Sequence, residues 1–316
     1  NSALYVGTNT TMSFDSVVTS AGNIYKKRKD SSATMTGTVQ IKDGSGVYQN
    51  MTFDSEDSNW TSRALDTWDG MVKDSSHGVS PISTPIPTGG TSIDIIKPRA
   101  VDDGDTAKAV KYDWKADLRI INGVAYDNAG NVVNLTYENP PGTFLNPVST
   151  TTFYDYREGK TFTVTDIDVS KLIQGGKVPA NRIIYYSNSA PNSAVRLKNG
   201  ATLPSGGLSL SSQNPVYIKG DFNTGTWQPA SVLGDAVTVL SNNWVDANSS
   251  MALSSRVASN TTVNAAVATG NTETTLGNYN GGAENVLRLL ENWTSKTMTY
   301  RGSILALWYS EQATGR

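Results

Sequence analysis

Short apolar runs separated by polar corners dominate the second half of the chain. The run 216–218, Val-Tyr-Ile, follows Pro215 and precedes Gly220, so residues that interrupt strands and form turns bound it on both sides. This pattern predicts a chain that winds, with each strand packing on the one before it. Runs of the same kind recur at 183–186, 194–197, 207–210, 236–240, 263–268 and 298–308.

The spacing of these runs suggests stacked repeats. Alternate runs, taken from Ile183 to Leu208, Val237 and Val263, are separated by roughly 25 to 30 residues, within the range of repeat architectures. We therefore predict a mainly β fold with a β-solenoid (β-helix-like) body. The alternative is an α+β pilin-like sheet with β-rich insertions.

One segment has helical periodicity instead. Val286, Leu289, Leu290 and Trp293 recur at i, i+3, i+4 and i+7, which is the apolar stripe of an amphipathic helix. We predict a short helix near 283–293. It would lie against the sheet or close the end of the solenoid.

Two local patterns predict hairpins. Asn122-Gly123 separates two apolar runs, and Asn-Gly favours the tight turns that join antiparallel strands. Residues 33–41 alternate with period two and precede the corner 43–46, so we expect a half-buried strand followed by a hairpin turn.

Proline density indicates a domain boundary. Pro81, Pro85 and Pro87 with Gly89 and Gly90 are incompatible with a central strand or a helix interior. We predict an extended connector near 78–92 that separates a β-rich N-terminal region, 1–90, from the solenoid-like body, 91–316. A length of 316 residues is also compatible with one continuous domain.

Composition narrows the function classes. Charged residues make up 17% of the chain against a usual value of about 25%, so hydroxyl and amide groups must supply most of the surface polarity, as in secreted strand-rich proteins. The absence of cysteine excludes disulfides and thiolate sites. His77 is the only histidine, and we interpret it as a turn residue rather than as part of a catalytic triad.

The charge balance and hydropathy limit the partners further. The net charge is −2, which creates no field to attract nucleic acid. No apolar run reaches 18 residues and no signal peptide opens the chain at Asn1, so we expect no membrane contact from this piece. We expect the chain to be a processed or truncated part of a longer precursor.

Lys26, Lys27, Arg28 and Lys29 form the one strong charge cluster. Such a cluster can contact phosphate or another polyanion, or it can protect a solvated loop or edge strand. We favour the second interpretation. The cluster remains a candidate ligand surface.

Asp102, Asp103 and Asp105 surround Gly104. Several carboxylates on a tight turn resemble part of a calcium loop, but the glutamate that closes an EF-hand is missing. We interpret the segment as an Asx turn, and keep the three aspartates as weak calcium candidates.

Glu158, Asp166 and Asp168 are the best candidates for the paired carboxylates of a glycosidase. However, Asp166 and Asp168 would point the same way from a strand, or Asp166 would cap a helix starting at Ile167. Arg157 beside Glu158 predicts an ion pair. We therefore predict no catalytic residue, no enzyme activity and no cofactor. Candidate sugar platforms are Tyr217, Trp227 and Trp244.

Several segments of the chain resemble a known protein family. One of them is Asn-Pro-Val-Tyr-Ile-Lys-Gly-Asp-Phe-Asn at 214–223. Together they are similar to segments of large pilus-assembly proteins of the PilX-like, type IV pilin-related group of bacteria. The similarity covers roughly residues 60–316 and is strongest after 150. The other motifs lie at 153–160, 166–172, 195–204, 235–244, 262–271, 281–285 and 290–293.

The resemblance implies a surface-exposed pilin-like subunit. In that family a cleaved leader and a hydrophobic N-terminal helix precede the globular part, and at least one related minor pilin carries a β-solenoid. This sequence departs from the family by lacking that helix. The family offers no catalytic residues to carry over.

We therefore predict a non-enzymatic bacterial protein, extracellular or at the cell surface. It would be a pilin-like or pseudopilin-like component with a structural or adhesive surface, or a filament-tip protein. Its partners would be other pilin-like subunits, further copies of itself in a filament, or a surface glycan. The alternatives are a secreted β-helix enzyme acting on polysaccharides and a DNA-binding competence pilin that uses the cluster 26–29.

Overall fold

The computed structural model describes residues 3–8, 11–82, 86, 90–280 and 286–315. The chain folds into two compact units: Asn1–Pro85 with Thr274–Gly282, and Ile86–Glu273 with Ala283–Arg316. No helix in the described part of the chain has the length and apolar character needed to cross a membrane.

The first unit is built from short strands and one α-helix. Its core gathers Ile24, Val39, Ile41, Met51 and Trp68, all fully buried. The sheets pair β1 with β4, β2 with β5 and β6, and β3 with β7. The elements are β1 (Leu4–Tyr5), β2 (Thr11–Phe14), β3 (Val18–Thr19), β4 (Ile24–Tyr25), β5 (Thr38–Lys42), β6 (Tyr48–Asn50), α1 (Trp60–Trp68), β7 (Val72–Lys73) and the 3-10 turn η1 (Ser75–His77).

The second unit contains a six-stranded sheet. Its strands lie in the order β12-β13-β15-β17-β19-β22. The β12–β13 pair is antiparallel and every other pair is parallel. The strands are β12 (Val148–Asp155), β13 (Lys160–Asp168), β15 (Ser193–Lys198), β17 (Val216–Lys219), β19 (Val237–Leu240) and β22 (Leu287–Leu289).

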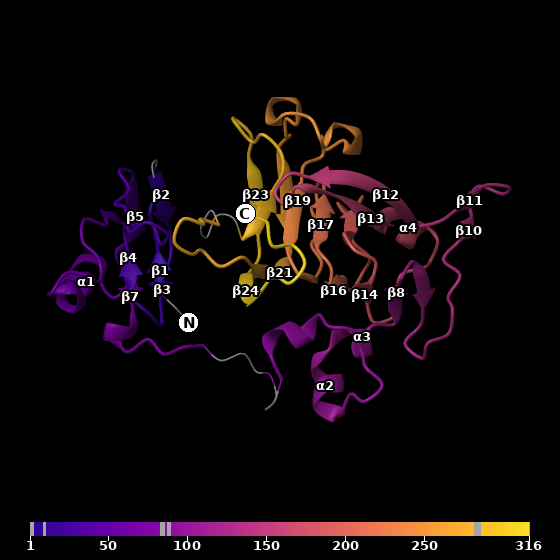
Figure 1. Cartoon of the computed structure of the whole chain (residues 1–316), viewed down its shortest axis with the longest axis horizontal. Helices are drawn as coiled ribbons and strands as arrows, with labels where there is room; N and C mark the ends of the chain where they lie inside the picture. The colour runs from indigo at the N-terminus through magenta and orange to yellow at the C-terminus, as the bar shows by residue number, and fades with distance from the viewer. Residues whose placement is uncertain (1–2, 9–10, 83–85, 87–89, 281–285, 316) are drawn as a thin grey trace. The chain divides into compact units, whose positions relative to one another are not determined.

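A seven-stranded sheet faces it. The order is β24-β21-β18-β16-β14-β8-β9, parallel except for the β8–β9 hairpin. From β13 to β19, successive strands alternate between the two sheets (Figure 1). The strands are β8 (Leu118–Ile121), β9 (Val124–Tyr126), β14 (Ile183–Ser187), β16 (Leu208–Ser212), β18 (Ala230–Gly234), β21 (Ala266–Asn271) and β24 (Ile304–Tyr309).

Smaller elements complete this unit. Two further sheets pair β10 (Tyr137–Glu138) with β11 (Phe144–Leu145), and β20 (Thr261–Asn264) with β23 (Met298–Arg301). The helices and 3-10 turns are η2 (Ser92–Ile95), α2 (Asp105–Val110), α3 (Tyr112–Lys115), α4 (Val169–Gln174), η3 (Asp246–Asn248) and η4 (Leu253–Ser255).

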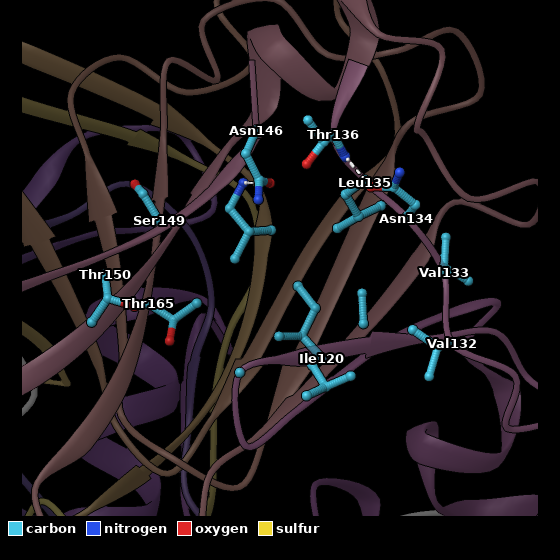
Figure 2. A pocket seen from close by; sticks show the side chains of 14 residues that line it. Ile120, Val132, Val133, Asn134, Leu135, Thr136, Asn146, Ser149, Thr150 and Thr165 are labelled. Atoms are coloured by element: carbon cyan, nitrogen blue, oxygen red, sulfur yellow. Dashed lines mark hydrogen bonds between the residues drawn. The ribbon is translucent and has the colours of Figure 1, made fainter. Parts of the chain in front are cut away.

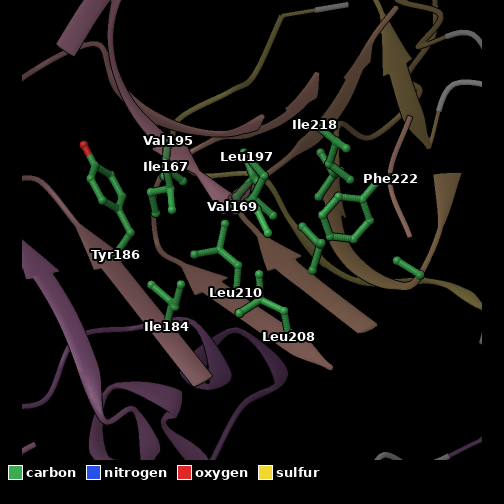
Figure 3. Packing of buried hydrophobic residues seen from close by; sticks show 14 of the residues in the cluster. Ile167, Val169, Ile184, Tyr186, Val195, Leu197, Leu208, Leu210, Ile218 and Phe222 are labelled. Carbon is green, nitrogen blue, oxygen red and sulfur yellow. The ribbon is translucent and has the colours of Figure 1, made fainter. Parts of the chain in front are cut away.

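The main core lies between the two large sheets. Ile167, Val195 and Leu197 from the six-stranded sheet pack with Ile184 and Leu210 from the seven-stranded sheet (Figure 3). Strand alternation places these side chains on the inner faces and sends their neighbours outward. The core therefore fixes the register of both sheets.

The predicted fold class is wrong. The chain is a mixed α/β protein with 13% helix and 36% strand, and its largest elements are two mostly parallel sheets rather than a β-solenoid. The pilin-like alternative does not describe these sheets either. The regularly spaced apolar runs do not belong to one sheet: Ile183 pairs with Ser209 in the seven-stranded sheet, whereas Val237 pairs with Val216 in the six-stranded sheet.

The predicted helix near 283–293 is also wrong. Leu287–Leu289 form β22, where Leu287 pairs with Val237 of β19. In this strand Leu287 reaches the main core, whereas Arg288 points to the opposite face and forms an ion pair with Glu158. Tertiary pairing thus outweighs the helical spacing. Residues 283–285 lie outside the described part.

Both hairpin predictions are confirmed. Ile121 pairs with Val124, and the turn residues Asn122 and Gly123 have φ of 48° and 82°, as a tight turn of this type requires. Thr38–Lys42 alternates between half-buried and buried positions and pairs with β6 across the corner 43–46. The strand predicted over 33–41 thus begins only at Thr38, and its first five residues were predicted wrongly. The predicted connector, 78–92, includes residues 83–85 and 87–89, which lie outside the described residues.

Candidate functional site

A pocket of about 310 Å³ opens where the two large sheets begin. One side comes from β8 and β9 of the seven-stranded sheet together with residues 132–136. The other comes from β12 and β13 of the six-stranded sheet (Figure 2). The hairpin turn at Gly123 and the antiparallel partner strand β12 thus create a space that the parallel strands farther along do not border.

The floor of this pocket is apolar and continues the main core. Ile120 and Leu135 belong to the core and are 0% and 6% exposed. Ala125, Val133 and Val148 pack against them and are partly buried. Because this surface is shared with the core, the floor is held rigidly.

Hydroxyl and amide groups form the rest of the lining. Thr150 and Thr165 are direct cross-strand partners on β12 and β13, so they share one face. The Thr165 hydroxyl lies 3.0 Å from the Tyr186 hydroxyl of the opposite sheet. The Thr150 hydroxyl has no hydrogen bond within the described part of the chain and is free to bind a ligand.

Two asparagines at the rim are oriented by their own backbone. The Asn134 side-chain oxygen accepts a bond from the Thr136 amide, and the Asn146 side-chain oxygen accepts one from the Val148 amide, both at 2.9 Å. These Asx turns fix which way each side chain points. The Nδ2 groups make no further hydrogen bond among the described residues, so they can donate to a ligand.

None of the fourteen residues that line the pocket is ionisable. The lining thus offers no general acid, no base and no anionic metal ligand. Across the described residues, no three His, Cys, Asp or Glu side chains are grouped to hold a metal ion. What the pocket can do chemically is form neutral hydrogen bonds and apolar contacts.

The sequence-predicted glycosidase carboxylates do not converge on a cleft. Asp166 is 3% exposed and bonds Arg196 and Lys198, each at 2.7 Å. Arg196 also bonds Asp246 at 2.6 Å. Burial opposes the charge of Arg196, but the hydrogen bonds that its guanidinium donates to Asp246 and Asp166 raise its pKa. The negative charge of Asp166 is therefore compensated by Arg196 and Lys198.

The other two candidate carboxylates have structural partners too. Asp168, and not Asp166, caps a helix: its side chain accepts a bond from the Lys171 amide of α4. Glu158 forms its ion pair with Arg288 of β22, where the sequence predicted Arg157, and it accepts the Gly315 amide at 3.0 Å. These contacts leave none of the three placed as a free acid or base.

Two further titratable groups on this outer face are shifted toward neutrality. Burial and the nearby charge of Arg196 lower the pKa of Lys219. Burial raises the pKa of Glu291, although hydrogen bonds from Ser241 oppose the shift. Both shifts follow from the removal of charged groups from water.

The aspartates of the candidate calcium loop are used locally. Asp103 bonds Lys111 at 2.5 Å and accepts bonds from the Trp114 indole and the Ala100 amide, both at 2.7 Å. Burial works in the opposite direction, but these donors lower the pKa of Asp103 to about 2. Asp102 and Asp105 are exposed. The loop thus resembles an anchored turn more than a cation site.

The basic cluster of the first unit meets anionic neighbours. Lys27 forms an ion pair with Glu56, and Arg28 bonds both oxygens of Asp30 at 2.7 and 2.8 Å. The Lys26 amide donates to Asp54. Part of the cluster's charge is therefore compensated, which weakens it as a polyanion contact.

His77 lacks the geometry of a catalytic triad. Asp74 and Ser76 lie on the same ring nitrogen, Nδ1, at 2.9 and 3.4 Å. Nε2 faces the Thr61 carbonyl at 3.1 Å. A triad needs the nucleophile and the carboxylate on opposite nitrogens, so His77 serves the capping box of η1.

The three candidate sugar platforms differ in exposure. Tyr217 is 1% exposed and donates to Asp155, and Trp244 is 3% exposed and donates to Asp246. Both pack against Phe153. Trp227 is 67% exposed, and is thus the one of the three that a ligand can reach.

No family model matches the chain, and comparison with curated proteins and with solved structures gives no match. The resemblance to pilus-related proteins therefore stays a prediction. The case for function depends on the geometry of the pocket and surface.

Sequence reasoning missed the pocket. Thr165 lies beside the candidate carboxylate Asp166, and Thr150, Asn146 and Leu135 lie in segments without a motif. The Asn122-Gly123 hairpin was the usable signal, since it places β9 at the end of a sheet. Nothing local shows that this end faces β12.

Proposed function

We propose that the chain is a non-enzymatic recognition protein whose pocket binds an uncharged, hydroxyl-bearing ligand, such as a sugar unit of a surface glycan. The observation that carries this proposal is the lining itself. Apolar side chains form one part, neutral hydroxyl and amide groups form the other, and no ionisable group is present. Pockets that orient small ligands typically combine these two materials.

The electrostatics favour a neutral ligand. A charged group entering this pocket would lose hydration without meeting an opposite charge, which is costly. A sugar instead has apolar C–H groups for the floor formed by Ile120 and Leu135, and hydroxyls for Thr150 and the two rim asparagines. A volume of about 310 Å³ suits one or two sugar rings.

The environment of the acidic residues supports a role without catalysis. A glycosidase needs two carboxylates facing one bond. Here Asp166 is bound by Arg196 and Lys198, and Glu158 by Arg288. None of them lines the pocket.

The proposed location and assembly come from the sequence. Low charge and abundant hydroxyl and amide residues fit a protein outside the bacterial cell. The resemblance to pilus-related proteins adds an adhesive or filament-tip role, with pilin-like subunits as neighbours. The pocket would then provide the contact with the surface glycan.

The test uses a matched pair of substitutions on β12. Thr150→Val removes the pocket hydroxyl but keeps the shape and strand preference of the side chain. Thr152→Val makes the same change one position along the same face, where Thr152 pairs with Thr163 and lies outside the pocket lining. Binding of neutral mono- and disaccharides to the intact chain would be measured by calorimetry.

We expect Thr150→Val to weaken binding by about 1 kcal/mol, roughly fivefold in Kd, because one hydrogen bond is lost. Thr152→Val should bind like the wild type. Equal affinities for both variants, or a preference for charged ligands, would contradict the proposal.

A further inference from the structure

Trp227 is much more exposed to solvent than the buried tryptophans of this chain. Its side chain is 67% exposed, whereas Trp60, Trp68 and Trp244 are at most 3% exposed. It lies in the loop that joins β17 to β18. A large aromatic ring that a well-ordered loop holds in solvent is available to stack against a ligand.

The loop around Trp227 is held by its own hydrogen bonds. Asn223 is 1% exposed and adopts a φ of 56°. Its side chain donates to the carbonyls of Gln228 and Asn264 at 2.7 and 3.0 Å and accepts the Gln228 amide at 3.0 Å. These bonds join residue 223 to residue 228 and thus close the loop segment that contains Trp227.

A neighbouring loop supports it from the side. The amides of Thr224 and Gly225 donate to the Ala201 carbonyl at 2.8 and 2.9 Å. The Gly206 amide donates to the Gln228 side chain at 3.1 Å. The β15–β16 loop and the β17–β18 loop therefore form one continuous surface around Trp227.

This surface is rich in hydroxyls and carries little charge. In the loops 199–207 and 220–229, Asp221 is the one charged residue, and it accepts bonds from the Thr262 amide and the Asn242 side chain. Arg182 lies beside it, with its guanidinium donating to the Ser205 and Pro179 carbonyls at 2.8 Å. The exposed hydroxyl side chains are those of Thr202, Ser205, Thr224 and Thr226.

We propose that Trp227 and the surrounding hydroxyls form a second binding site, on which a sugar ring of a neutral polysaccharide stacks. The flat indole matches the C–H face of a sugar ring, and the hydroxyls can bond its equatorial groups. The site shares no residue with the pocket. It deepens the proposed function and rests on it, because it extends one sugar contact to a glycan chain.

A protein partner fits this surface less well. Protein interfaces need a continuous apolar core with a polar rim. In the loops 199–207 and 220–229, Trp227 is the one large apolar side chain that is exposed, since Leu203 and Phe222 are buried. One ring among hydroxyls favours a sugar.

The test compares two exposed aromatic residues of the intact chain. Trp227→Ala removes the platform and Trp227→Phe keeps a smaller ring. The control is Phe144→Ala. Phe144 is also an exposed aromatic residue, at 72%, and it lies in a different element, the β10–β11 hairpin, where it pairs with Glu138. Binding to neutral polysaccharides (xyloglucan, galactomannan and dextran) and to anionic alginate would be measured by affinity electrophoresis, with circular dichroism to confirm folding.

We expect at least one neutral polysaccharide to retard the wild type, and Trp227→Ala to weaken that binding about tenfold or more. Trp227→Phe should retain part of it and Phe144→Ala all of it. No retardation by any neutral polysaccharide, or equal retardation of all variants, would overturn the proposal. Loss with Trp227→Ala but not with Thr150→Val would uphold this site and reject the pocket.

Discussion

The outer face of the six-stranded sheet and the pocket at the start of the two sheets differ in the charge of their side chains. On the outer face Asp166, Arg196, Lys198 and Asp246 bond one another within 2.6 to 2.7 Å. In the pocket, fourteen uncharged residues surround about 310 Å³ of space. The outer face thus consists of charged groups paired with one another, whereas the pocket is an open cavity lined by uncharged groups.

This difference shows where a ligand can bind at low cost. Ligands that approach the outer face must compete with short ion pairs already made there. A ligand in the pocket meets Thr150, Asn134 and Asn146, whose free donors and acceptors are otherwise left to water. The charges on the outer face thus stabilise the fold, and in the proposed function the neutral residues of the pocket bind the ligand.

The largest expected effect comes from a break in the charged face. Arg196→Met leaves Asp166 buried without its main partner, and we expect the free energy of unfolding to fall by roughly 3–5 kcal/mol. Lys198→Met is the matched control on the same strand and face. Its side chain is 26% exposed and bonds the same Asp166, so we expect a loss of about 1 kcal/mol or less.

Urea unfolding would measure both values. A loss for Arg196→Met no greater than that for Lys198→Met would show that the network does not stabilise this face. Ligand affinity should be unchanged in both folded variants, because neither residue lines the pocket.

A smaller effect is expected from acid. The pKa of Asp103 is lowered from 3.8 to about 2 in the folded chain, so its stabilising contribution is present above pH 3.8 and is lost as the pH falls toward 2. Asp103→Asn should therefore be less stable than the wild type at neutral pH. The difference between the two should shrink as the pH falls through this window.

The control is Asp102→Asn, the exposed neighbour, which should be as stable as the wild type at neutral pH. Urea unfolding between about pH 6 and pH 2 gives the comparison. A constant difference between Asp103→Asn and the wild type would mean that Asp103 does not titrate as its contacts indicate.

The sequence predicted local structure better than its assembly. The Asn122-Gly123 hairpin and the strand at Thr38–Lys42 follow from turn chemistry and from alternation over a few residues. Sheet membership does not, because an apolar run pairs equally well with several others. The spacing predicts that Ile183 and Val237 occupy equivalent positions of stacked repeats, but the two residues lie in different sheets.

The same limit explains the errors about sites. Alternation does not show which face of β17 is covered, so the sequence makes Tyr217 a candidate sugar platform although it is buried against Phe153. Asp166 is a candidate carboxylate in the sequence, but its ion-pair partner Arg196 lies thirty positions away, so no local pattern predicts the pair. The pocket needs β9 and β12 to meet, and no local pattern shows this. Trp227 alone among the proposed platforms is exposed.

The most direct test of the central claim is methyl chemical-shift mapping of the intact chain during titration with a neutral disaccharide. The pocket account predicts that the largest shifts fall on the methyl groups of Ile120, Leu135 and Val148. They should be the same at pH 5.5 and pH 8, between which uncharged groups do not titrate. Shifts centred on Val164 and Leu240, which belong to the cluster on the outer face, or no shifts at all, would contradict it.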